Sequence, residues 1–137
     1  MISGIDKSWT SPSCGIYRNN VDNQDTSFTK IVDFPPLAFG SMDQADIDND
    51  GDLDYVVTGK NANGEFKNYF IVDKRISFAE KPDFRTTEFL IDNDSSNKVK
   101  AQFIDNDNDG FIDLFCSIYN DNSKSKSSNK NINGYLI

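Results

Sequence analysis

The 137-residue chain contains no histidine. This absence removes the commonest general base of enzymes, every nucleophile that a histidine activates, and every zinc site with imidazole ligands. A catalytic base would have to be a lysine, an arginine or a tyrosine, and no residue of these types stands out in the sequence. The composition therefore favours a protein that is not an enzyme.

Cysteine is scarce as well, since the chain has only Cys14 and Cys116, far apart and in no CxxC pair. This number and spacing predict that the chain has no structural zinc site. Cys116 lies in the apolar run "DLFCSIY", which predicts a buried free thiol. A disulfide between the two cysteines is the alternative.

Long apolar runs are also missing, and the 14 basic residues are outnumbered by 22 acidic ones. No segment approaches the roughly 20 apolar residues of a membrane-spanning helix, so we expect no membrane insertion. No export-signal pattern opens the chain, and we expect any export signal to lie outside this sequence. The net charge of −8 argues against nucleic acid or an anionic membrane as a partner.

The negative charge gathers in two segments. The first acidic loop, residues 46–54, reads "DIDNDGDLD", and the second acidic loop, residues 105–113, reads "DNDNDGFID". Carboxylates crowded within a few Å repel one another unless a cation lies between them. The two segments therefore predict bound cations.

Both loops place Asp at positions 1, 3, 5 and 9 and Gly at position 6. Alternate carboxylates can converge on one centre if the chain curls, and glycine permits the sharp reversal. Calcium fits such a site better than magnesium because it accepts six to eight oxygens at variable angles. The predicted ligands of two calcium ions are the side chains of Asp46, Asp48, Asp50 and Asp54 with the backbone carbonyl of Asp52, and the side chains of Asp105, Asp107, Asp109 and Asp113 with the backbone carbonyl of Phe111.

An EF-hand shares the first six positions but needs a bidentate glutamate at position 12, where this chain has Val57 and Cys116. β-Branched and aromatic residues follow both loops, which predicts strands rather than helices. The remaining alternative is an Asp- and Asn-rich turn without an ion. The repetition of five matching positions favours metal, in a structural role.

The loops belong to a longer repeat with an offset of 59 residues, since 105 − 46 = 59. An expected strand comes before and after each loop, within residues 40–46 and 55–60 in the first copy and within 98–105 and 114–119 in the second. A strand pair with a tight turn at 73–75 is expected over 67–81, and "GIYRN" matches its first strand, "NYFIV". We expect an all-β fold without amphipathic helices.

These segments resemble the FG-GAP or VCBS repeats of the integrin α-subunit propeller, chiefly through "GSMDQADIDNDGDLDYVVTG" and "AQFIDNDNDGFIDLF". The resemblance implies integrin-like β-propeller blades, each a four-stranded antiparallel unit with calcium between its first two strands. About two such units would form an incomplete ring. The implied division is residues 1–34 as the last three strands of a blade, 35–84 as a complete blade and 85–137 as a partial blade.

The resemblance also implies an extracellular or cell-surface protein that binds a protein or glycan ligand, with calcium in a structural role. Trp9, Tyr17 and Tyr119 are candidates for stacking on sugars. The alternatives are a piece of a secreted polysaccharide-acting enzyme and a scaffold. Either further repeats of a longer protein or other copies of the chain would complete the propeller.

Overall fold

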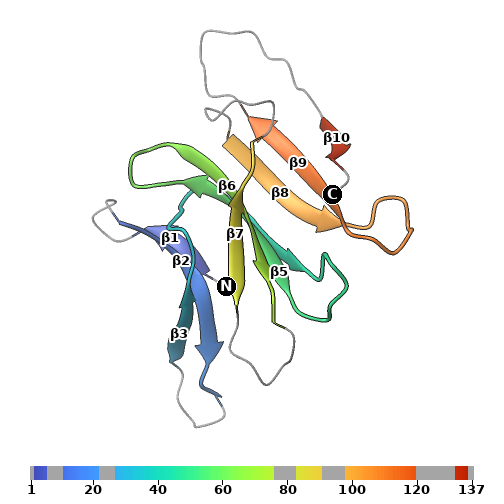
Figure 1. The fold of residues 1–137 in the computed structure, drawn as a ribbon. Helices are drawn as coiled ribbons and strands as arrows, with labels where there is room; N and C mark the ends of the chain where they lie inside the picture. Colours follow the sequence, from blue (N-terminus) through green and yellow to red (C-terminus); the bar gives the residue numbers. More distant parts are fainter. Residues whose placement is uncertain are drawn as a thin grey trace, which may run out of the picture.

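A computed structural model describes residues 2–5, 11–21, 27–75, 83–90, 98–119 and 132–135. These residues form ten strands in three antiparallel sheets, and they include no α-helix (Figure 1). The prediction of an all-β chain is confirmed. In each sheet the strands are neighbours in the order in which they follow one another along the chain.

The second sheet lies between the other two (Figure 1). The first sheet comprises β1 (Ile2–Ile5), β2 (Pro12–Asn19) and β3 (Phe28–Asp33). The second comprises β4 (Met42–Ala45), β5 (Asp54–Lys60), β6 (Phe66–Asp73) and β7 (Phe84–Glu88). The third comprises β8 (Lys98–Ile104), β9 (Asp113–Tyr119) and β10 (Ile132–Tyr135).

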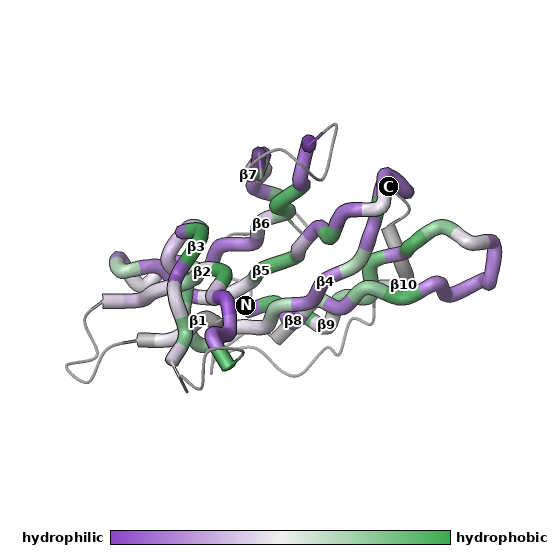
Figure 2. Tube along the Cα trace, turned by 90° about the horizontal axis from the view of Figure 1, so that it is seen from below, coloured by the Kyte–Doolittle hydropathy of each residue, from purple (hydrophilic) through white to green (hydrophobic). Residues whose placement is uncertain are grey.

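The central position of β5 follows from its sequence, "DYVVTGK". A strand with both faces covered is apolar without alternation, and Figure 2 shows the hydrophobic stretch along β5. Val57 packs toward the first sheet and Val56 toward the third, and both are fully buried. In β8, by contrast, buried Val99 alternates with exposed Lys100, as expected for a strand with only one covered face.

The two cysteines lie on opposite sides of the second sheet. Cys14 packs with Tyr55 and Ile71 in the cluster between the first and second sheets. Cys116 packs with Val56 in the cluster between the second and third. Both thiols are free, as predicted, and burial raises the pKa of each to about 11. The disulfide alternative is therefore wrong.

The tight turn expected at 73–75 is also wrong. β6 ends at Asp73, which pairs with Phe84 of β7, so the connection spans residues 74–83. Phe84 is held there because its ring packs edge-on against Phe34, with centroids 5.2 Å apart. The strand expected at 76–81 lies outside the described residues, and the second sheet extends to Glu88, past the boundary expected at residue 84.

The match between β2 and β6 is shifted by one residue from the one that the sequence indicates. Aligning "GIYRN" with "NYFIV" makes Ile16 equivalent to Tyr69. Ile16, however, packs toward the following sheet, whereas Tyr69 packs toward the preceding one. The residue of β6 that packs toward the following sheet is Phe70. A shift of one residue exchanges the two faces of a strand, so this difference decides which side chains meet.

Candidate metal centre

The two acidic loops occupy equivalent places in the fold. The first joins β4 to β5 and the second joins β8 to β9, so each links the first two strands of its sheet. Their backbones also agree, with φ of 57° at Asn49 and 60° at Asn108, and 90° at Gly51 and 88° at Gly110. Asparagine and glycine tolerate positive φ better than other residues. The shared sequence therefore gives one loop conformation twice.

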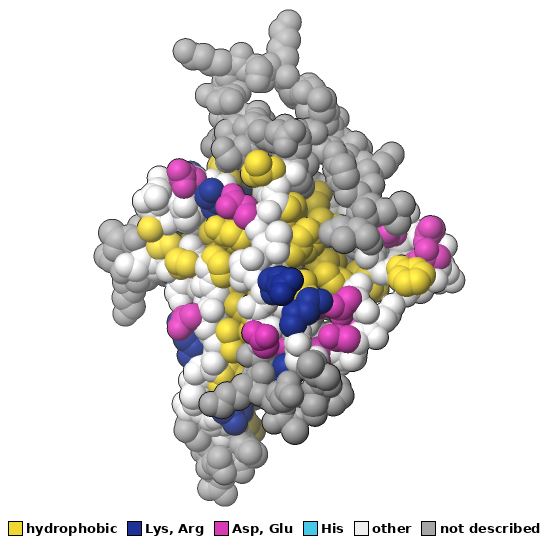
Figure 3. Space-filling view, in the orientation of Figure 1, with side chains coloured by type: hydrophobic (Ala, Val, Ile, Leu, Met, Phe, Trp, Pro, Cys, Tyr) yellow, Lys and Arg dark blue, Asp and Glu magenta, His cyan; other side chains and the backbone are white. Residues whose placement is uncertain are grey.

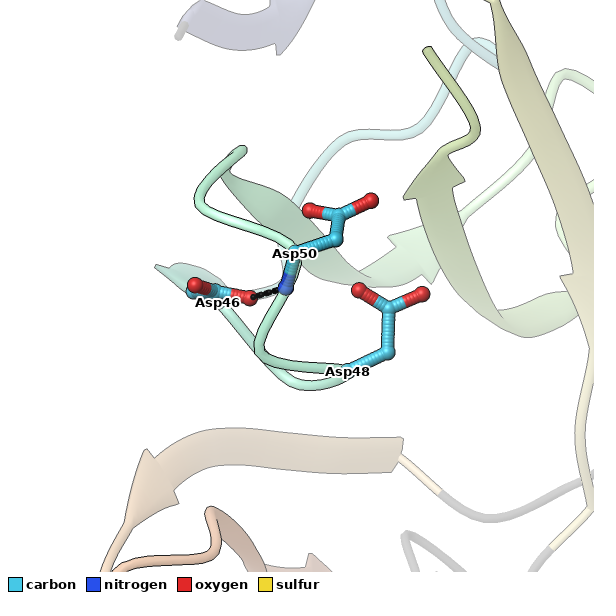
Figure 4. Close-up of side chains that lie close together, drawn as sticks. All are labelled: Asp46, Asp48 and Asp50. Carbon is cyan, nitrogen blue, oxygen red and sulfur yellow. Dashed lines mark hydrogen bonds between the residues drawn. The ribbon is translucent and has the colours of Figure 1, made fainter. Parts of the chain in front are cut away.

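The first acidic loop gathers three of its predicted ligands. One carboxylate oxygen from each of Asp46, Asp48 and Asp50 lies within 4.8 Å of the other two. The loop is held closed by Asp46, whose two carboxylate oxygens accept backbone N–H groups. One accepts that of Asp50 at 3.1 Å (Figure 4), and the other accepts that of Gly51 at 2.9 Å. These bonds fix the Asp46 carboxylate beside Asp48 and Asp50.

The second acidic loop repeats this arrangement with Asp105, Asp107 and Asp109, whose oxygens meet the same 4.8 Å limit. Asp105 accepts the N–H groups of Asp109 at 3.2 Å and Gly110 at 3.1 Å. The hydrogen bonds thus repeat position by position across the offset of 59 residues, because the same residue types stand at the same places.

The ninth positions, Asp54 and Asp113, lie outside these triads. Asp54 is fully buried and accepts the N–H groups of Ile47 at 3.0 Å and Asp73 at 2.9 Å. Burial raises the pKa of Asp54, and the two N–H donors partly offset that shift. Asp113 is half-buried and accepts the N–H group of Asn106 at 3.1 Å. Both close the base of their loop.

Position 7 was predicted to contribute only a backbone carbonyl, from Asp52 or Phe111, and that role stays a prediction. The two side chains differ sharply. The Asp52 carboxylate is buried and lies 2.8 Å from the Arg75 guanidinium, whereas the Phe111 ring is 62% exposed. Burial raises the pKa of Asp52, and the charge of Arg75 opposes this shift.

Two basic side chains lie beside the first loop, and their position was not predicted from the sequence. Lys74 forms an ion pair with Asp48, and Arg75 contacts both Asp52 and Asp73, the latter at 2.9 Å from Nε. Figure 3 shows basic side chains among acidic ones over this part of the molecule. The only signal was the charged run "DKR" at residues 73–75, which was assigned to a turn. Which loop that run would meet depends on the pairing of β5 with β6.

The donor set fits calcium by its chemistry. Each triad offers only carboxylate oxygens, the hard ligands that calcium prefers over the softer sulfur and imidazole groups suited to transition metals. Three side chains cannot fill six to eight positions, so the carboxylate at position 9, the carbonyl at position 7 and water would supply the rest. In the first loop the Lys74 ammonium supplies positive charge next to Asp48.

The candidate sugar-stacking residues receive little support. Tyr17 is half-buried, and the Lys30 ammonium lies 5.5 Å from the centre of its ring. Trp9 and the side chain of Tyr119 lie outside the described residues. Within the described part of the chain, no helix is long and apolar enough to cross a membrane.

The chain matches no protein-family model, no curated protein and no solved structure. The geometry of the two acidic loops is therefore the main guide to function.

Proposed function

We propose that this chain is a calcium-binding repeat segment of an extracellular or cell-surface protein, with FG-GAP-type propeller blades. Calcium has a structural role: it neutralises each carboxylate triad and fixes the loop that leads into β5 or β9. The observation that carries the proposal is the repetition of one loop conformation, with three converging carboxylates in each copy. A turn without an ion needs no such convergence.

The extracellular location follows from the calcium affinity expected for such loops. Exposed sites of this kind bind calcium with Kd values of about 10⁻⁴ to 10⁻³ M, as extracellular modules do. Asp48, Asp50, Asp107 and Asp109 are all exposed, which suits weak binding. Cytosolic calcium would leave these loops empty.

The protein acts by binding rather than by catalysis, with a protein or glycan as its ligand. The carboxylates that could serve as acids or bases are committed to the ions and to the N–H groups of the loops. A comparison of glycan and protein capture in calcium and in EDTA tests this role. Capture that is lost in EDTA supports a calcium-dependent adhesion module.

Thermal unfolding in calcium, magnesium and EDTA tests the metal. A site that binds only the folded chain stabilises it by about 2.7 kcal/mol when the free ion is at 100 times its Kd. We expect calcium to raise the melting temperature, magnesium to raise it less, and EDTA to reverse the gain. Asp83→Ala removes an exposed carboxylate outside both loops and should leave the calcium effect intact. An unchanged melting temperature in EDTA would contradict the proposal.

A further inference from the structure

The contact between the second and third sheets depends on an open strand edge. Among the described strands β8 pairs with β9 alone, and on its other side polar side chains of the second sheet bind its backbone groups. The Ala101 N–H donates to Ser41 Oγ at 2.9 Å, the Phe103 N–H donates to Asp43 Oδ2 at 2.8 Å, and Thr58 Oγ1 donates to the Val99 carbonyl at 2.7 Å.

An apolar contact accompanies these hydrogen bonds. Val56 of β5 is fully buried against Val99, Ala101, Leu114 and Cys116. We call the face of a sheet that meets the following sheet its outgoing face, and the face that meets the preceding sheet its incoming face. Around β4 and β5 the outgoing face of the second sheet thus combines three polar side chains with one apolar side chain, Val56, and Phe70 of β6 adds further apolar area.

The third sheet repeats these four positions at the offset of 59 residues. Lys100, Gln102, Phe115 and Ser117 correspond in sequence to Ser41, Asp43, Val56 and Thr58. Gln102 pairs with Phe115 and Lys100 with Ser117 across β8 and β9, so all four lie on one face. They are exposed, Phe115 by 55%, and together with residues 41–43 of the second sheet and Ala101 they line an open hollow of about 450 Å³. None of the described residues therefore covers the outgoing face of the third sheet at these positions.

The chemistry of this face suits another strand edge. Gln102 and Ser117 can each donate and accept, as backbone N–H and C=O groups require, and Lys100 can donate to a carbonyl. Phe115 offers apolar area at the position of Val56. A face with these groups can bind an open strand edge in the way that the second sheet binds β8.

The first sheet offers the complementary incoming face. Its first strand, β1, pairs only with β2 among the described strands, which leaves one edge of β1 without a strand partner. Ile16 packs toward the second sheet, so Tyr17, the next residue of β2, points to the incoming face. Phe28, 58% exposed at the start of β3, adds apolar area. A second copy of the chain therefore offers the third sheet an open strand edge with apolar side chains beside it.

We propose that the outgoing face of the third sheet binds the incoming face of the first sheet of a second copy, head to tail. Such a heterologous contact generates a ring if its rotation closes and a longer assembly if it does not. The proposal is independent of calcium, because it depends on strand edges and side chains outside the acidic loops.

The molar mass in solution tests the proposal, with one variant on each face. Wild-type chain should form assemblies larger than its 15.4 kDa monomer. Phe115→Asp and Tyr17→Asp should each give monomers. An equimolar mixture of the two variants should form dimers and nothing larger, because each pair then has one intact outgoing and one intact incoming face. Light scattering after gel filtration distinguishes these species.

Leu90→Asp serves as the control, because Leu90 is 49% exposed and belongs to neither face. It should assemble as the wild type does, and circular dichroism should show the same strand content in all variants. A monomeric wild type would overturn the proposal. So would a mixture that stays monomeric, or a Tyr17→Asp variant that assembles normally, since the latter would indicate contact between two outgoing faces.

Discussion

The two acidic loops share a sequence pattern and a backbone conformation but differ in their surroundings. The first is bordered by Lys74 and Arg75 and closed by a fully buried Asp54. The second has no ion pair within the described part of the chain, and its exposed Phe111 replaces the buried Asp52. The repeat thus specifies the loop, whereas the neighbouring strands determine how its charge is balanced.

This difference indicates that the two loops contribute differently to folding and to calcium binding. The first loop is held in place partly by a contact with another strand, because Asp54 accepts the N–H of Asp73 and so links the loop to β6. Among the described residues, the side-chain hydrogen bonds that hold the second loop all come from its own segment. We therefore expect the first loop to matter more for folding, and the second to depend more on calcium.

The largest effect is expected from Asp54→Ala compared with Asp113→Ala, both in EDTA. Removing Asp54 leaves the N–H groups of Ile47 and Asp73 without their acceptor, which costs about 3 kcal/mol of unfolding free energy. Asp113 accepts only one N–H near the surface, so its removal should cost about 1 kcal/mol. Urea unfolding measures both. Equal losses would show that the two loops contribute alike to folding.

The next effect concerns calcium itself. Asp50→Ala and Asp109→Ala each remove the carboxylate at the fifth position of one loop, and each leaves the other loop able to bind calcium. One saturated site should still contribute about 2.7 kcal/mol at 100 times its Kd. At lower calcium, Asp50→Ala should retain the larger gain in melting temperature, because it keeps the second loop, whose carboxylates pair with no lysine among the described residues. The reverse order would assign the tighter site to the first loop.

Arg75→Met should destabilise the chain by about 2 kcal/mol, because it leaves the buried carboxylates of Asp52 and Asp73 without their cation. The partial exposure of Arg75 keeps this loss below the full cost of an unpaired buried charge. Arg85→Met is the matched control, since Arg85 is exposed on β7. Urea unfolding in EDTA measures the loss, and a loss equal to that of the control would show that Arg75 does not brace the loop.

The smallest effect is expected from Lys74→Met. The Lys74–Asp48 pair is substantially exposed, so its loss should cost only about 0.5 kcal/mol without calcium. Calcium affinity of the first loop should rise about twofold, because the ion no longer competes with an ammonium group for Asp48. Titration calorimetry on the Asp109→Ala background isolates this loop. Lys67→Met removes an ion pair far from the loop and should leave the affinity unchanged.

Much of the fold could be predicted from residue patterns, because period-2 alternation and acidic turns are local signals. The strands around both loops lie where "YVVTGK" and "LFCSIY" predict them. The strand at 84–88 was missed, because "FRTTE" lies in a polar stretch and is fixed by the packing of Phe84 on Phe34. The residues of both triads could be predicted, because the three carboxylates of each are close together in the sequence.

The sequence by itself determined the all-β class, the two acidic loops and the burial of the Cys116 thiol. Each depends on residues that are near one another in the chain. Only the tertiary structure decided that Cys14 and Cys116 lie on opposite sides of the second sheet. It also decided that the residues of β2 and β6 with equivalent orientations differ by one position from the sequence match, and that Lys74 and Arg75 lie beside the first loop. Strand register and sheet stacking bring distant residues together, and a one-residue shift reverses every side chain of a strand.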